Sequence, residues 1–191
     1  MPYPTLPRLV TDRLVVRPGI APDVPAIVSY YLCNRAHLRP VDPVRPESFY
    51  GEEFWYARLR QDHQEIRDDR SLRLFLFRRE EEDRVIGVAN FTQFMRGAAH
   101  YCTLGYAIDQ AEQGKGLMRE ALTAAIEHIF QERNLHRVQA NYMPRNERSG
   151  ALLRRLGFTI EGLARDYLLI AGRWEDHVLA SLTNPSWKQP S

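Results

Sequence analysis

Apolar residues recur along this chain with two periods, one typical of strands and the other of helices. Runs rich in β-branched and aromatic residues predict strands over residues 13–18, 71–77, 84–94, 100–108, 137–143, 158–170 and 173–182. Apolar residues at helical spacing predict helices over residues 23–32, 47–67, 117–130 and 146–155. The resulting order, β-α-α-β-β-β-α-β-α-β-β, predicts an α/β protein (an α+β mixed sheet) with helices on both faces of the sheet.

Turn signals between these elements favour one continuous domain. The acidic run at residues 80–83 indicates a hairpin turn between the second and third strands, and residues 171–173 join the last two strands. Pro40, Pro43 and Pro46 predict a rigid loop, because the cluster is too short for a flexible tether. No linker-like stretch divides the chain, so we expect residues 1–191 to form a single domain.

Composition limits the class of protein. Hydrophobic residues make up 44% of the chain, enough for a substantial core, and no apolar run reaches the ~18 residues of a membrane span. Residues 1–14 lack the apolar segment of a secretory signal, so we expect a cytoplasmic protein. Cys33 and Cys102 show no pairing pattern, and we expect both to be reduced and buried. The net charge of +2 does not by itself indicate nucleic-acid binding.

Two glycines and a lysine, Gly114, Lys115 and Gly116, stand directly before the third predicted helix. A helix N-terminus favours phosphate through its unpaired N–H groups and its dipole, and glycines let a phosphate approach the backbone. The spacing of a P-loop is absent because no glycine stands five residues before Gly114, and a dinucleotide fingerprint fails because Arg119 occupies its third small position. A glycine turn without a ligand stays open as the plainer interpretation.

A third phosphate-binding device fits the spacing. Residues 111–118, AEQGKGLM, resemble the pyrophosphate loop of the GNAT superfamily of N-acetyltransferases, whose signature is Q/R-x-x-G-x-G/A, although Ala111 stands at the first place. Residues 141–158 resemble the second half of that fold, with its Asn, Ser, Leu and Gly-Phe places held by Asn146, Ser149, Leu152, Leu153, Gly157 and Phe158. Helix capping alone would also account for Asn146 and Ser149.

The resemblance extends nearly end to end and is to the ribosomal-protein-alanine N-acetyltransferase (RimJ-like) branch of the superfamily. It implies the GNAT acyl-CoA N-acyltransferase fold with about seven strands. It also implies acetyl-CoA as cosubstrate, bound in a gap between residues 104–108 and 137–143, with the thioester carbonyl directed at a backbone amide near Ala107. The cofactor-binding residues it assigns are Tyr106, Ala107, Ile108, Gln113, Gly114, Lys115, Gly116, Leu117, Met118, Asn146 and Ser149.

The same resemblance implies that an amine attacks the thioester directly, so neither cysteine is needed as a nucleophile. Ser149 is the first candidate to donate a hydrogen bond to the leaving thiolate, with Tyr142 and Tyr167 as alternatives. For the base or water-holding group the candidates are Asp166 and Glu161, and the resemblance does not decide between them.

Other polar residues receive structural or orienting roles. We expect Asn90 and Asn141 to face the cleft and to orient the substrate amide. We expect His100 and His177 to lie in strands as structural histidines rather than as bases. An α-amine has a pKa of about 7.7–8.0 against about 10.4 for lysine, so an enzyme for N-termini can work with a weak base or a water chain.

The implied substrate is a protein N-terminus, namely the N-terminal alanine of small-subunit ribosomal protein number five. Two alternatives stay open: a GNAT enzyme for a small-molecule amine, and a non-catalytic ribosome-assembly factor with the same fold. We expect no metal, because the six histidines and two cysteines lack ligand spacing. We also expect no membrane partner, and a monomer or weak dimer. The scattered arginines permit contact with ribosomal RNA without indicating it.

Overall fold

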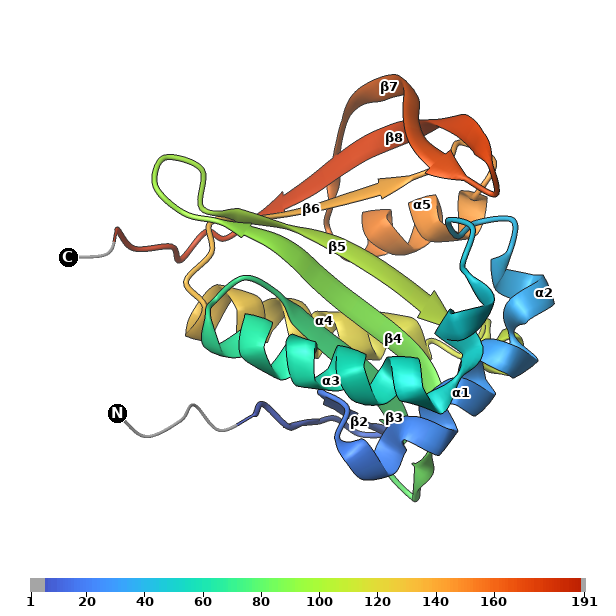
Figure 1. Ribbon diagram of the computed structural model, residues 1–191. Helices are drawn as coiled ribbons and strands as arrows, with labels where there is room; N and C mark the ends of the chain where they lie inside the picture. Colours follow the sequence, from blue (N-terminus) through green and yellow to red (C-terminus); the bar gives the residue numbers. More distant parts are fainter. Residues whose placement is uncertain (1–5, 190–191) are drawn as a thin grey trace.

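The computed structural model describes residues 6–189, so part of the segment in which we expected no secretory signal lies outside the described residues. Its strands form one sheet in the order β1-β2-β3-β4-β5-β6-β8-β7, in which only β5 and β6 pair in parallel (Figure 1). The strands are β1 (Leu9–Val10), β2 (Leu14–Arg17), β3 (Leu72–Arg78), β4 (Glu81–Met95), β5 (Tyr101–Ile108), β6 (Arg137–Tyr142), β7 (Thr159–Ile170) and β8 (Arg173–Thr183).

Five α-helices lie in the described part of the chain: α1 (Val24–Cys33), α2 (Arg35–Leu38), α3 (Glu52–Arg67), α4 (Leu117–Glu132) and α5 (Glu147–Arg155). Short 3₁₀ turns occupy Ala21–Asp23, Glu47–Tyr50 and Gln110–Glu112. No helix in residues 6–189 is long and apolar enough to cross a membrane.

Period-two alternation along the strands divides the core into two layers. On β3, Leu72, Leu74 and Leu76 pack in the cluster that contains the apolar face of α4. Phe75 and Phe77 on the same strand point the other way, into the cluster formed by α1 and α3. Each of these side chains is fully buried, and such burial stabilises a fold by about 1.5–3 kcal/mol per residue. The sheet is therefore covered by α4 and α5 on one face and by α1 and α3 on the other.

The predicted mixed sheet with helices on both faces is confirmed, with one strand more than the seven expected. The extra strand is the two-residue β1, which is too short to give a periodic signal. The helix expected over residues 47–67 is interrupted, because Gly51 is extended (φ −107°, ψ 151°) and α3 begins after it. The indole of Trp55 donates to the carbonyl of Phe49 at 2.8 Å and so fixes the preceding turn against α3.

Three smaller expectations need correction. The predicted hairpin is confirmed, since β3 and β4 pair antiparallel, but its turn is formed by residues 79 and 80, because Glu81 already pairs with Arg78 and belongs to β4. Cys33 is exposed at the end of α1, whereas Cys102 is buried as expected. His100 precedes β5 with a positive φ of 44°, and its carbonyl accepts from the backbone N–H groups of His136 and Arg137.

The two parallel strands separate at their carboxyl ends (Figure 1). Pairing between β5 and β6 ends at Leu104 and Ala140. Beyond that point β5 continues along β4 as far as Ile108, while β6 continues along β8 as far as Tyr142. The edge of β5 from Gly105 to Ile108 therefore has no strand beside it on the β6 side, and its backbone groups on that side are available to a ligand.

Candidate active site

The glycine loop between β5 and α4 lies at the end of this free edge. Gly114 and Gly116 have positive φ angles of 75° and 77°, a conformation that side chains disfavour. Gly116 is the N-cap of α4, so the loop leads directly onto the unpaired N–H groups of a 16-residue helix. A Cβ placed on Gly114 would meet nothing within 4 Å. The loop thus has the conformation and the open space of an anion-binding site.

Ion pairs hold the loop against the sheet. Arg13, just before β2, donates to Glu120 in the first turn of α4 at 2.7 Å and to the carbonyl of Lys115 at 2.9 Å. On the other side Glu112 accepts from Arg78 at 2.6 Å and from Lys115 Nζ at 3.0 Å. Burial would raise the pKa of Glu112, but the bonds from Lys115 and Arg78 outweigh it and hold this pKa below its usual range. Lys115, expected at the pyrophosphate, is thus also a partner of Glu112.

Gln113 joins the loop to two helices that are distant in the sequence. Its side chain contacts His37 Nε2 of α2 at 2.8 Å and accepts a short hydrogen bond from Arg148 of α5. Nearby, the backbone N–H of Gln110 donates to the side chain of Asn34 at 3.0 Å. The sequence pattern identified Gln113 but gave no signal for His37 or Arg148, because only the tertiary fold brings them to this loop.

The start of α5 faces the free edge of β5. The Asn146 side chain caps the helix by accepting from the backbone N–H of Ser149 at 3.2 Å. The hydroxyl groups of Ser149 and Tyr106 are 2.7 Å apart, so one hydrogen bond joins α5 to β5 across the gap. Burial raises the pKa of Tyr106 to about 12, which keeps its phenol protonated at neutral pH. Gly150 follows Ser149 in α5, and Tyr142 packs against it so closely that a Cβ at position 150 would lie 2.7 Å from the tyrosine ring.

The residues expected on the late hairpin separate into two groups. Tyr167 reaches the gap, with its hydroxyl 3.4 Å from Asn141 Nδ2 and its ring 5.8 Å from that of His177. Asp166, next to it, has a φ of 46°, and its backbone N–H donates to the side chain of Asp176 at 2.9 Å.

Glu161 lies toward the other end of the sheet. It pairs with Arg137 at the start of β6 and accepts from Ser181 at 2.8 Å. The bond from Arg137 holds the pKa of Glu161 below its usual range. Of the two candidate bases, Glu161 is therefore the one that lies at the end of the sheet where β5 and β6 are still paired, and its two partners there hold it in place. His177 lies in β8 as expected, with Nδ1 2.9 Å from the Glu175 carbonyl.

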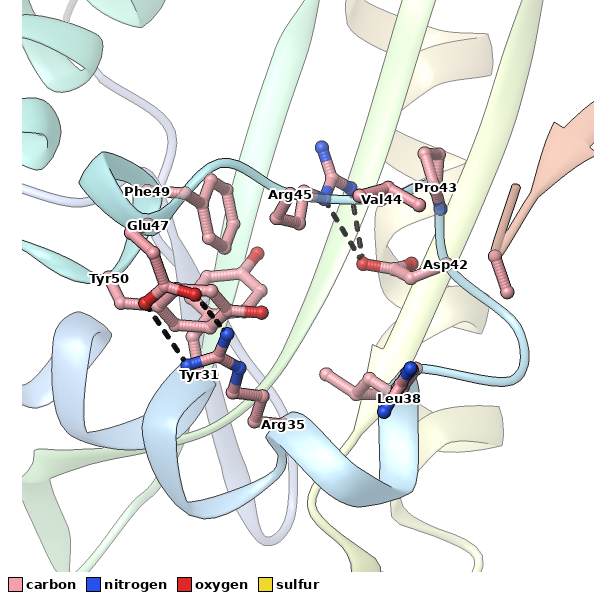
Figure 2. A pocket seen from close by; sticks show the side chains of 12 residues that line it. Tyr31, Arg35, Leu38, Asp42, Pro43, Val44, Arg45, Glu47, Phe49 and Tyr50 are labelled. Atoms are coloured by element: carbon pink, nitrogen blue, oxygen red, sulfur yellow. Dashed lines mark hydrogen bonds and ion pairs between the residues drawn. The ribbon is translucent and has the colours of Figure 1, made fainter.

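A cavity of about 350 Å³ opens between α2, the following loop and the 3₁₀ turn at Glu47–Tyr50 (Figure 2). Tyr31 and Phe49 form its apolar wall, and the ion pairs Arg35–Glu47 and Arg45–Asp42 lie across it. The carbonyl of Asp42 accepts from the backbone N–H of Ala171 at 3.1 Å. The proline-containing loop therefore joins the α1 face of the sheet to the tip of the β7–β8 hairpin.

The parted strands, the glycine loop and the capped helix are features of an acyl-CoA transferase fold. The chain belongs to the acetyltransferase (GNAT) domain family, whose model matches residues 13–159. The predicted superfamily and fold class are thereby confirmed.

Individual relatives are similar over nearly the whole chain. This chain is 51% identical over 180 residues to the [ribosomal protein uS5]-alanine N-acetyltransferase of Escherichia coli K12. The match covers 94% of this chain and 92% of the relative. The structure of ribosomal-protein-S5-alanine acetyltransferase from Vibrio fischeri superposes with a TM-score of 0.92 at 36% identity, covering 96% of this chain and all of that one. The structure of Mycobacterium smegmatis RimJ in complex with CoA-disulfide superposes with a TM-score of 0.85 at 26% identity, covering 96% of this chain and 89% of that one.

Gly116→Asp tests the glycine loop. The new carboxylate would stand at the helix N-terminus, and two like charges about 4 Å apart near a surface repel by several kcal/mol. We expect the affinity for coenzyme A, measured by titration calorimetry, to fall by about a hundredfold or more.

Gly97→Asp is the matched control. Gly97 also has a positive φ, 69°, and open space around it, but it lies in the β4–β5 turn. The Gly97→Asp variant should bind coenzyme A with the same affinity as the unchanged protein. Equal affinity in both variants would contradict the assignment of the loop.

Proposed function

We propose that this protein transfers the acetyl group of acetyl-CoA to the N-terminal α-amine of a protein, namely the N-terminal alanine of a small-subunit ribosomal protein, in the cytoplasm. The observation that carries the proposal is 51% identity over 94% of the chain to an enzyme with that named substrate. The free edge of β5 beside the glycine loop supports the cofactor part of the proposal.

The residues around the gap fit acetyl-CoA. In this proposal the N–H groups from Gln113 to Met118, at a helix N-terminus with two positive-φ glycines, hold the pyrophosphate. The free backbone of Tyr106, Ala107 and Ile108 binds the pantetheine arm as a neighbouring strand would. Asn146 keeps α5 capped, and Arg148 adds a charge that the sequence did not suggest. When bound, the cosubstrate supplies an activated acetyl group.

Ser149 and Tyr106 serve the leaving sulfur in this proposal. Because the Tyr106 phenol stays protonated, it can donate to the oxygen of Ser149 at 2.7 Å. The hydroxyl hydrogen of Ser149 is then free to point into the gap and to donate to a thiolate. A hydrogen bond to a charged group is worth about 1.5–3 kcal/mol, more than a neutral one.

The acceptor amine must be neutral to attack. The difference of ~2.5 pKa units between an α-amine and lysine corresponds to about 3 kcal/mol of deprotonation at neutral pH. Asp166 stays the proposed base or water-holding group. Tyr167, whose hydroxyl lies 3.4 Å from Asn141 Nδ2 at the gap, stays an alternative donor to the leaving thiolate. A monomer or weak dimer, and contact with the ribosome, stay predictions.

The substrate class is tested with two short peptides and acetyl-CoA, by following free-thiol release. One peptide begins with a free alanine and lacks lysine; the other has the same sequence with a blocked N-terminus and one lysine. We expect turnover of the first only. Turnover of the lysine peptide, or of small amines instead of either peptide, would contradict the proposal.

Ser149→Ala tests the leaving-group role. The helix cap uses the backbone N–H of Ser149 and is unaffected by the change. We expect kcat to fall by about ten- to a hundredfold, the value of one hydrogen bond to a charged group, and the affinity for coenzyme A to fall much less. Thr123→Ala removes a hydroxyl from the exposed side of α4 and should leave both values as they are. An unaltered kcat in Ser149→Ala would remove Ser149 from the mechanism.

A further inference from the structure

A single row of residues crosses the sheet at the level where β5 leaves β6. On β3, β4 and β5 the register places Arg73, Asn90 and Gly105 side by side. On β6 and β8, Asn141 is the first residue beyond the last β5–β6 pair and lies beside Leu179. The neighbours of this row along β4 and β5 show which way it faces, because Val88 and Ala107 pack with the α1 cluster. The whole row therefore lies on the α1 face.

Gly105 leaves a vacant position in this row. It is exposed, its φ is not in the positive range, and a Cβ built on it would meet nothing within 4 Å. No backbone requirement explains glycine here, and a β-branched residue would suit a strand better. The missing side chain gives access to the backbone of β5 at the point where the gap begins.

Two carboxamides flank the vacant position. The oxygen of Asn90 is buried without a hydrogen-bond partner, while the side chain as a whole is half-buried, so its amide nitrogen is the end that faces outward. The amide nitrogen of Asn141 is directed at Tyr167 at 3.4 Å, which leaves its oxygen to accept from elsewhere. A donor and an acceptor thus stand on either side of Gly105, and the structure gives neither of them a protein partner within residues 6–189.

The opposite face offers no comparable approach. Tyr106 and Tyr142 point to that side, where Tyr106 is bonded to Ser149 and Tyr142 packs on Gly150. The α4–α5 face is therefore filled with side chains at this level. The open side at the start of the gap is therefore the α1 face, over Gly105.

We propose that the vacant position over Gly105, between Asn90 and Asn141, seats the first residue of the acceptor peptide. This inference rests on the proposed function and adds how an α-amine is recognised. The Asn141 oxygen accepts a hydrogen from the amine, and the Asn90 nitrogen donates to the first peptide carbonyl. At a peptide N-terminus a single carbon atom, Cα, separates the α-amine from that carbonyl group, whereas the ε-amine of lysine is attached to a chain of methylene groups with no carbonyl at that distance. The two carboxamides therefore select a peptide N-terminus.

The test is Gly105→Val, with KM and kcat measured on the alanine-initiated peptide and coenzyme A affinity by calorimetry. Valine suits a strand, and its Cβ would meet nothing within 4 Å, while its methyl groups fill the vacant position. We expect the peptide KM to rise at least about tenfold with coenzyme A affinity unchanged. Gly105→Ala should give a smaller rise in the same direction and guards against misfolding of the valine variant.

Asn90→Asp tests the donor separately, because it replaces the outward N–H₂ group with a negatively charged oxygen of the same shape, which accepts hydrogen bonds and cannot donate one. Its peptide KM should also rise about tenfold, the value of one hydrogen bond. Gln139→Ala is the control: it removes an amide from the same face of β6, two residues before Asn141 and beside Thr103, where β5 and β6 are still paired. It should leave KM unchanged.

The outcomes separate the two claims. If the unchanged protein acetylates the peptide and both Gly105→Val and Asn90→Asp have the same peptide KM as the unchanged protein, the peptide does not bind over Gly105 and the proposed function stands. If the unchanged protein binds coenzyme A but acetylates no peptide, the proposed function fails and the seat fails with it.

Discussion

The separation of two parallel strands is the constraint on which the rest of this structure depends. Past Leu104 and Ala140, β5 and β6 give up their mutual hydrogen bonds, which would be costly if both edges stayed empty. Each strand keeps its other neighbour, since β4 holds β5 and β8 holds β6. The long antiparallel partners therefore keep the gap open, and a ligand with peptide-like groups can pair with the edge that is left.

Both ends of the gap are fixed by contacts between segments far apart in the sequence. Gln113 connects the glycine loop to α2 and α5, and the Tyr106–Ser149 bond connects β5 to α5. The same sheet region presents a different surface on each face: aromatic and hydroxyl groups toward α5, and a vacant glycine between carboxamides toward α1. This division leaves the α1 face as the open side at the point where the gap begins.

Local patterns in the sequence were sufficient for most of the elements and for the glycine loop, but not for the two-residue β1 or for the break at Gly51. Gly114, Gly116 and Asn146 could be identified because helix caps and positive-φ turns depend on residues close in the chain. His37 and Arg148 could not, since their roles arise only when α2 and α5 fold onto the loop. Tyr167 was named through the resemblance, but its contact with Asn141 could not be predicted. A register shift between Ala164 and Leu168 sets three residues against the single Asp176, which strand alternation does not reveal.

Amide hydrogen exchange with and without coenzyme A tests directly whether the ligand occupies the gap between β5 and β6. Backbone amides on the free edge of β5, within residues 105–108, should exchange rapidly in the free protein and become protected when coenzyme A binds. Amides of β1, at the far edge of the sheet, should not change. Unchanged exchange over residues 105–108 in the presence of bound coenzyme A would show that the ligand does not use the gap.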